Sequence, residues 1–171
     1  MDEDGDCRAE VAIHPPFMGI AGTVILCDHV YQAQGGKYVI AGTYTTIEVR
    51  VPDLRLAEHR LDNLAVYVRL RPEQLGTLAC ELLVRDEQHP PWHEPMLRLR
   101  WDAIVTRDNI RLVECAYVLP SFTVTVKAND PAALPPPMVE VRYAIELRAA
   151  GEVVGGTPLD LRFVPAGRPA P

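Results

Sequence analysis

The chain has very few of the residues on which common active sites depend. Ser121 is the only serine among 171 residues, and it lies between a proline and a phenylalanine. The Gly-x-Ser-x-Gly turn of the α/β-hydrolases is therefore absent. The Gly-x-Gly-x-x-Gly and Walker patterns that cradle phosphate groups are also absent. These gaps exclude the commonest serine hydrolase and nucleotide-binding motifs.

Basic residues are in the minority. The chain has 17 Lys and Arg against 23 Asp and Glu, a net charge of −6, and only Lys37 and Lys127 are lysines. Nucleic acids and anionic membranes are bound by basic faces, so we expect neither as a partner. No apolar run approaches the roughly 20 residues of a membrane helix, and the acidic start lacks the basic region of a secretory signal. We therefore expect a cytoplasmic protein.

Cysteine and aromatic residues give no site motif either. The four cysteines contain no Cys-x-x-Cys pair, which argues against a zinc knuckle or a redox motif. We interpret them as free thiols, as is usual in the cytoplasm. Aromatic residues make up 6% of the chain, which is low for a sugar site built on stacked rings. We expect no bound cofactor.

The chain is rich in alternating apolar and polar residues. From Val139 to Leu147 every second residue is apolar. Because successive side chains of a strand point to opposite faces, this pattern predicts a strand with one buried face. Two segments, 23–31 and 37–51, are apolar at neighbouring positions, which predicts strands covered on both faces, either at the centre of the sheet system or under a long covering loop. The alternation recurs at 64–71, 78–85, 97–102, 122–126 and 159–163.

Glycines and prolines separate these runs. Gly35-Gly36 and Ala150-Gly151 predict hairpin turns, and most of the 16 prolines lie between apolar runs. We predict an all-β fold: an antiparallel β-sandwich of about eight or nine strands, immunoglobulin-like or similar, with a closed barrel as the alternative. Only residues 53–60 suggest a helical turn. One domain covers 17–164, between an acidic flexible tail at 1–16 and a proline-rich disordered tail at 165–171.

The sequence His89-Pro90-Pro91-Trp92-His93-Glu94 holds the only candidate metal ligands that we single out. Two imidazoles and a carboxylate could bind zinc or iron. The prolines exclude a helix, however, so the spacing does not place both rings on one helical face. The simpler interpretation is a stiff surface loop packed by Trp92.

Asp28 is the most unusual polar residue, because it follows apolar residues on one face of a predicted strand. A carboxylate on an apolar face must be paired or lie at the strand end. We expect it to accept hydrogen bonds from backbone amides or an arginine and to fix a turn. Asp28 and His29 point to opposite faces and form no dyad. Cys27 and His29 share a face, but a thiol in a central strand lacks the low pKa and exposure of a nucleophile.

Arginines occupy the polar faces of several predicted strands, interleaved with glutamates. One interpretation is a solvated sheet face with cross-strand ion pairs. The other is an interaction surface, since arginine is favoured at interfaces. The residues concerned are Arg69, Arg71, Arg98, Arg100, Arg142 and Arg148.

The opening segment resembles a family of uncharacterised bacterial proteins, a domain of unknown function. The resemblance rests on the Leu26-Cys27-Asp28 strand, the Gly36-Lys37 turn and the Ile40-x-Gly42-x-Tyr44 strand. The final hairpin at 143–164 is also similar, whereas residues 86–137 match less well. The resemblance implies a compact β-sandwich in the bacterial cytoplasm, singles out Asp28 and Gly42, and carries over no catalytic residue.

From the sequence we expect a non-catalytic β-sandwich that binds a protein partner or forms a homo-oligomer. Edge strands are the natural contact, since they can add a strand or pack a face. The alternative is a metal-dependent or small-molecule-binding enzyme that uses His89, His93 and Glu94.

Overall fold

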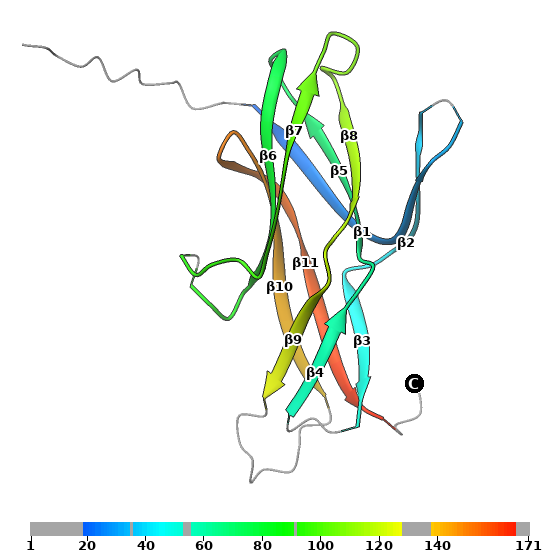
Figure 1. The fold of residues 1–171 in the computed structure, drawn as a ribbon, viewed down its shortest axis with the longest axis vertical. Helices are drawn as coiled ribbons and strands as arrows, with labels where there is room; N and C mark the ends of the chain where they lie inside the picture. The colour runs from blue at the N-terminus through cyan, green and yellow to red at the C-terminus, as the bar shows by residue number, and fades with distance from the viewer. Residues whose placement is uncertain (1–18, 35, 53–55, 91, 128–137, 167–171) are drawn as a thin grey trace, which may run out of the picture.

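A computed structural model of the chain describes residues 19–34, 36–52, 56–90, 92–127 and 138–166. Eleven strands and no helix run through these residues (Figure 1), so the all-β prediction is confirmed with more strands than expected. The strands are β1 (Ala21–Gln32), β2 (Tyr38–Thr43), β3 (Thr46–Val51), β4 (Leu56–Leu61), β5 (Ala65–Arg71), β6 (Gly76–Asp86), β7 (Leu97–Val105), β8 (Val113–Val118), β9 (Phe122–Lys127), β10 (Val139–Ala149) and β11 (Glu152–Pro165).

Nine of the described strands form two sheets. Sheet A has the order β2-β1-β5-β8, and sheet B has the order β3-β11-β10-β6-β7. Strands β4 and β9 form a separate antiparallel pair. The pairing of β11 with β3 is parallel, which the antiparallel prediction did not include. The immunoglobulin-like arrangement stays a prediction.

The segment at 37–51 forms two edge strands and not the single covered strand that was predicted. β2 lies at the edge of sheet A and β3 at the edge of sheet B. Gly42 has a φ of 66°, a left-handed conformation that interrupts an extended strand. The chain then crosses from one sheet to the other, and Tyr44 N donates a hydrogen bond to Leu26 O on the way. The segment 23–31 is central as predicted, because β1 lies between β2 and β5. It is not covered along its whole length, however, because Asp28, His29 and Tyr31 are exposed.

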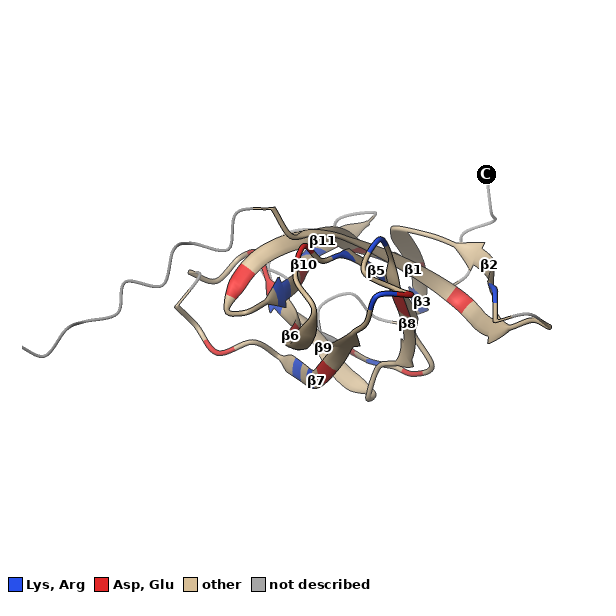
Figure 2. Ribbon diagram, turned by 90° about the horizontal axis from the view of Figure 1, so that it is seen from above, with Lys and Arg blue, Asp and Glu red and all other residues tan. Residues whose placement is uncertain are grey.

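One hydrophobic core is shared by both sheets and by the β4–β9 pair; Figure 2 shows these strands from above. In β10 the buried residues are every second one, from Val141 to Ala149, as the alternation predicted. β11 contributes Leu159, Leu161 and Phe163, all with no exposed surface. Burying each such side chain contributes about 1.5–3 kcal/mol. Both sheets therefore contribute side chains to the same core.

The two sheets meet most closely where β1 passes β11. A Cβ built on Gly155 would lie 2.2 Å from the backbone oxygen of Gly22. Only a glycine leaves room for this approach. The hairpin turn predicted at Ala150-Gly151 is present, and both residues have positive φ, 50° and 86°, as a type I′ turn requires.

Some segments have other bounds in the structure than the sequence predicted. Residues 56–60 belong to β4, which pairs with β9, so no helical turn forms there; residues 53–55 lie outside the described residues. Pro165 pairs with Val51 as the last residue of β11, so the predicted disordered tail begins too early. The predicted flexible tail at 1–16 lies outside the described residues, as do 167–171. No described segment forms a helix long and apolar enough to cross a membrane.

Candidate functional site

The loop after β6 brings His89 and His93 together. Their ring centroids are 4.9 Å apart, and His89 Nδ1 lies 3.1 Å from Asp86 Oδ2. Asp86, His89, His93 and Glu94 line a small hollow of about 200 Å³. Within the described part of the chain, however, no group of three or more His, Cys, Asp or Glu is placed to hold a metal ion.

Asp28 does not form the hydrogen bonds that the sequence predicted. Its side chain is exposed, and no described residue donates a hydrogen bond to it. The reason is that β1 faces the core only as far as Leu26 and Cys27, after which it pairs with β2 beyond the core. Gly42 lies opposite Asp28, and a Cβ there would be 2.1 Å from Asp28 Oδ2.

The three thiols in the described part of the chain are poorly placed for nucleophilic chemistry. Cys27 is fully buried and donates to the backbone oxygen of Ala65. Burial, and next the charge of Asp28, raises the pKa of the Cys27 thiol. Burial likewise raises the pKa of Cys80, to about 11, and that of Cys115. Because the thiolate is the reactive form, these raised pKa values disfavour a cysteine nucleophile.

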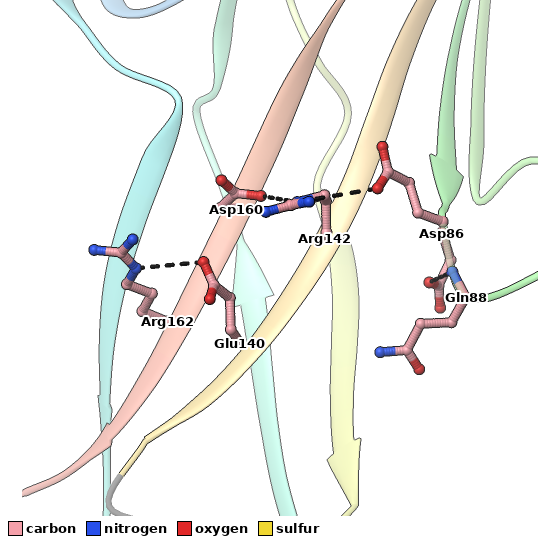
Figure 3. Close-up of polar contacts among 7 residues, drawn as sticks. Asp86, Gln88, Glu140, Arg142, Asp160 and Arg162 are labelled. Atoms are coloured by element: carbon pink, nitrogen blue, oxygen red, sulfur yellow. Dashed lines mark hydrogen bonds and ion pairs between the residues drawn. The ribbon is translucent and has the colours of Figure 1, made fainter.

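Ion pairs cover the outer face of sheet B. Arg142 Nε lies 2.8 Å from Asp160 Oδ1, and Arg162 Nε lies 3.5 Å from Glu140 Oε1 (Figure 3). These pairs join β10 to β11, which agrees with the interpretation of a solvated, ion-paired face. Exposed pairs of this kind contribute only about 0–1 kcal/mol each.

Glu81 lies between two arginines of the edge strand β7. Its Oε1 accepts a hydrogen bond from Arg100 Nε at 2.5 Å and lies 3.6 Å from Arg98 Nη1. The hydrogen bond from Arg100 is the main reason that the pKa of Glu81 is lowered. These contacts join the edge strand β7 to its neighbour β6. Charged residues on an edge strand oppose pairing with another chain.

The four edge strands of the two sheets differ in charge. β3 carries Glu48 and Arg50, β7 carries two arginines and an aspartate, and β8 carries Glu114. β2 has the sequence Tyr-Val-Ile-Ala-Gly-Thr and carries no charge. Among the described residues, β2 pairs with β1 alone, so its second edge is open. The sequence did not predict this open edge, because the apolar pattern of residues 37–51 is typical of a covered strand.

Apolar side chains lie next to this open edge. Tyr31 is 55% exposed and pairs with Val39 of β2 in the β1–β2 register. The ring of Tyr38 packs against Tyr67 with centroids 5.5 Å apart, and Tyr67 donates a hydrogen bond to Glu114. The ring contact therefore links the first residue of β2 to β5, whereas Ala41 and Thr43 at the other end of β2 are exposed.

Comparison of the chain with protein-family models, with curated proteins and with solved structures found no match. The resemblance of the opening segment to a bacterial family therefore stays a prediction.

Proposed function

We propose that this chain is a non-catalytic β-sheet domain that associates with a second copy of itself through the open edge of β2. The observation that carries the proposal is the contrast among the edges. β2 is uncharged and open, whereas β3, β7 and β8 each carry charge. An open apolar edge is a template for pairing with another strand.

Antiparallel pairing of two β2 strands fits the symmetry of most oligomers. A two-fold axis places the same strand on both sides of the contact, so each copy offers and receives the same groups. Two four-stranded sheets would then join into one sheet of eight strands. Tyr31, which is exposed beside Val39, would add apolar area to the backbone hydrogen bonds.

The test is light scattering coupled to size-exclusion chromatography over a series of protein concentrations. The wild-type mass is expected to rise from 19.0 kDa towards twice that value as the concentration increases. Ala41→Lys places a charge on the exposed part of β2 and is expected to keep the chain monomeric.

Ile104→Lys is the matched control, because Ile104 is an exposed residue of β7, the edge strand of the other sheet. This variant is expected to associate as the wild type does. A wild-type chain that stays at 19.0 kDa at every concentration would refute the proposal. Equal loss of association in both variants would show that the contact is not specific to β2.

A further inference from the structure

We propose that a hollow at one end of sheet A binds an oxyanion, a carboxylate or phosphate group, through Arg69, Arg71 and Arg111. The hollow has a volume of about 750 Å³, and its lining includes these arginines, Glu73 and Gly19. It lies apart from the β2 edge, so the inference is independent of the proposed self-association.

The backbone fixes the three arginines in place. Arg69 and Arg71 are two residues apart on β5 and therefore share a face. Ala21 of β1 lies opposite Arg71 in the strand register and also lines the hollow. The third arginine, Arg111, comes from the connection between β7 and β8.

This connection is held by hydrogen bonds of Asn109. Its Oδ1 accepts from the backbone N of Thr106 at 2.7 Å, and its Nδ2 donates to the backbone O of Ile104 at 2.9 Å. The backbone O of Asn109 accepts from Leu112 N at 2.9 Å. Arg111 therefore extends from a turn whose backbone is held by hydrogen bonds.

Two of the three arginines of the hollow have no partner among the described residues, although the carboxylate of Glu73 lines the same hollow. Among the described residues, Arg71 and Arg111 form no ion pair or hydrogen bond. Arg69 Nε lies 3.8 Å from Glu114 Oε1, but Glu114 also accepts the hydrogen bond of Tyr67. Glu73 forms no ion pair with a described arginine either. Its carboxylate lies against the backbone of Gly19, where a Cβ would be 1.9 Å from Oε1.

The chemistry of arginine determines the ligand class. The planar guanidinium binds carboxylate and phosphate oxygens with two parallel hydrogen bonds. Like charges at alternate positions of one strand, about 7 Å apart, repel each other, and a bound anion would relieve this repulsion. The chain as a whole has a net charge of −6, so three arginines lining one hollow are a local exception and not part of a generally basic surface.

Two sources could supply such a group: a free anion, or the carboxylates of Asp2, Glu3, Asp4 and Asp6, which precede Gly19 in the same chain. The experiment is isothermal titration calorimetry with citrate and with inorganic phosphate. The chains compared are the wild type, Arg71→Gln, Arg111→Gln and a variant in which the four acidic residues are replaced by Asn or Gln. Arg107→Gln is the control, because Arg107 is exposed in the same connection but does not line the hollow.

Each arginine variant is expected to bind about tenfold more weakly or worse, since a hydrogen bond to a charged group contributes at least that factor. Arg107→Gln should bind as the wild type does. Tighter binding to the acid-free variant than to the wild type would identify the chain's own carboxylates as the occupant, and equal binding would identify a free anion. Absence of binding to both the wild type and the acid-free variant would overturn the proposal. A loss of affinity in Arg107→Gln equal to that in Arg71→Gln and Arg111→Gln would also overturn it. Circular dichroism of each variant separates a binding effect from misfolding.

Discussion

Substitution of Gly155 by alanine tests how the two sheets are joined. Gly155 of β11 faces Gly22 of β1, and the new Cβ would lie 2.2 Å from the Gly22 oxygen. Cβ atoms essentially never come within 3.0 Å of such an atom, so the two backbones must separate by about 0.8 Å. Neither is free to move, because Gly22 pairs with Leu70 and Gly155 pairs with Leu147.

The expected cost follows from this geometry. Inserting a methyl group into a closely packed interior typically costs 1–3 kcal/mol, and occasionally more. Because the contact is with backbone and not with a flexible side chain, we expect a loss of about 3 kcal/mol in the free energy of unfolding. For a domain of this size, that loss lowers Tm by about 6–12 °C.

Urea unfolding followed by circular dichroism measures the loss directly. Gly151→Ala is the control for a glycine substitution without a steric clash, because Gly151 has nothing within 4 Å of the new methyl group. Unlike Gly155, it has a positive φ, 86°. Its cost is backbone strain alone, about 1 kcal/mol. If Gly155→Ala were no more destabilising than Gly151→Ala, the close approach of β1 and β11 would be refuted.

Three other predictions concern the core, the tyrosines and the histidine loop. Leu161→Ala, which empties a fully buried site, should lower the free energy of unfolding by about 2–5 kcal/mol, as measured in urea; a loss below 1 kcal/mol would contradict the described core. Burial, and next the hydrogen bond to Glu114, raises the pKa of Tyr67 from 10.0 to about 12. The contribution of this raised pKa to the free energy of unfolding is complete below pH 10 and is lost as the pH rises towards 12. The free energy of unfolding should therefore fall less between pH 10 and 12 in Tyr67→Phe than in the wild type. An equal fall in both chains would contradict the raised pKa of Tyr67. Equilibrium dialysis should find no stoichiometric zinc; one zinc per chain, lost in both His89→Ala and His93→Ala, would contradict the described geometry.

The strands could be predicted from the sequence because alternation is a local property. β10 follows the predicted pattern from Val141 to Ala149, and the turn at Ala150-Gly151 has the expected positive φ values. The assignment of strands to sheets depends instead on pairings between residues that are distant in the chain. The parallel pairing of β3 with β11 joins Thr46 to Asp160, and nothing in either segment specifies that partner.

The candidate sites could not be predicted from the sequence for the same reason. The arginines on β5 were noticed in the sequence, but Arg111 comes from another part of the chain, and only the fold shows that it lines the same hollow. His89 and His93 are close in both sequence and structure, yet spacing alone does not establish a third ligand. Asp28 was assigned to a buried face because the alternation was assumed to face the core along the whole strand. β1 leaves the core after Cys27.

The Asp28–Gly42 pair also restricts how two β2 strands could meet. Gly42 has a left-handed φ, so regular pairing is limited to the residues before it, from Tyr38 to Ala41. Antiparallel pairing of that segment places the two-fold axis between Val39 and Ile40. At about 3.4 Å per residue, the two copies of Gly42 then lie about 17 Å apart. Each copy of Asp28 lies beside its own Gly42, so the two Asp28 carboxylates are separated by a similar distance. This distance exceeds the screening length of about 8 Å at physiological salt. The exposed carboxylates would therefore not oppose this register, whereas registers that overlap at Gly42 would bring them together.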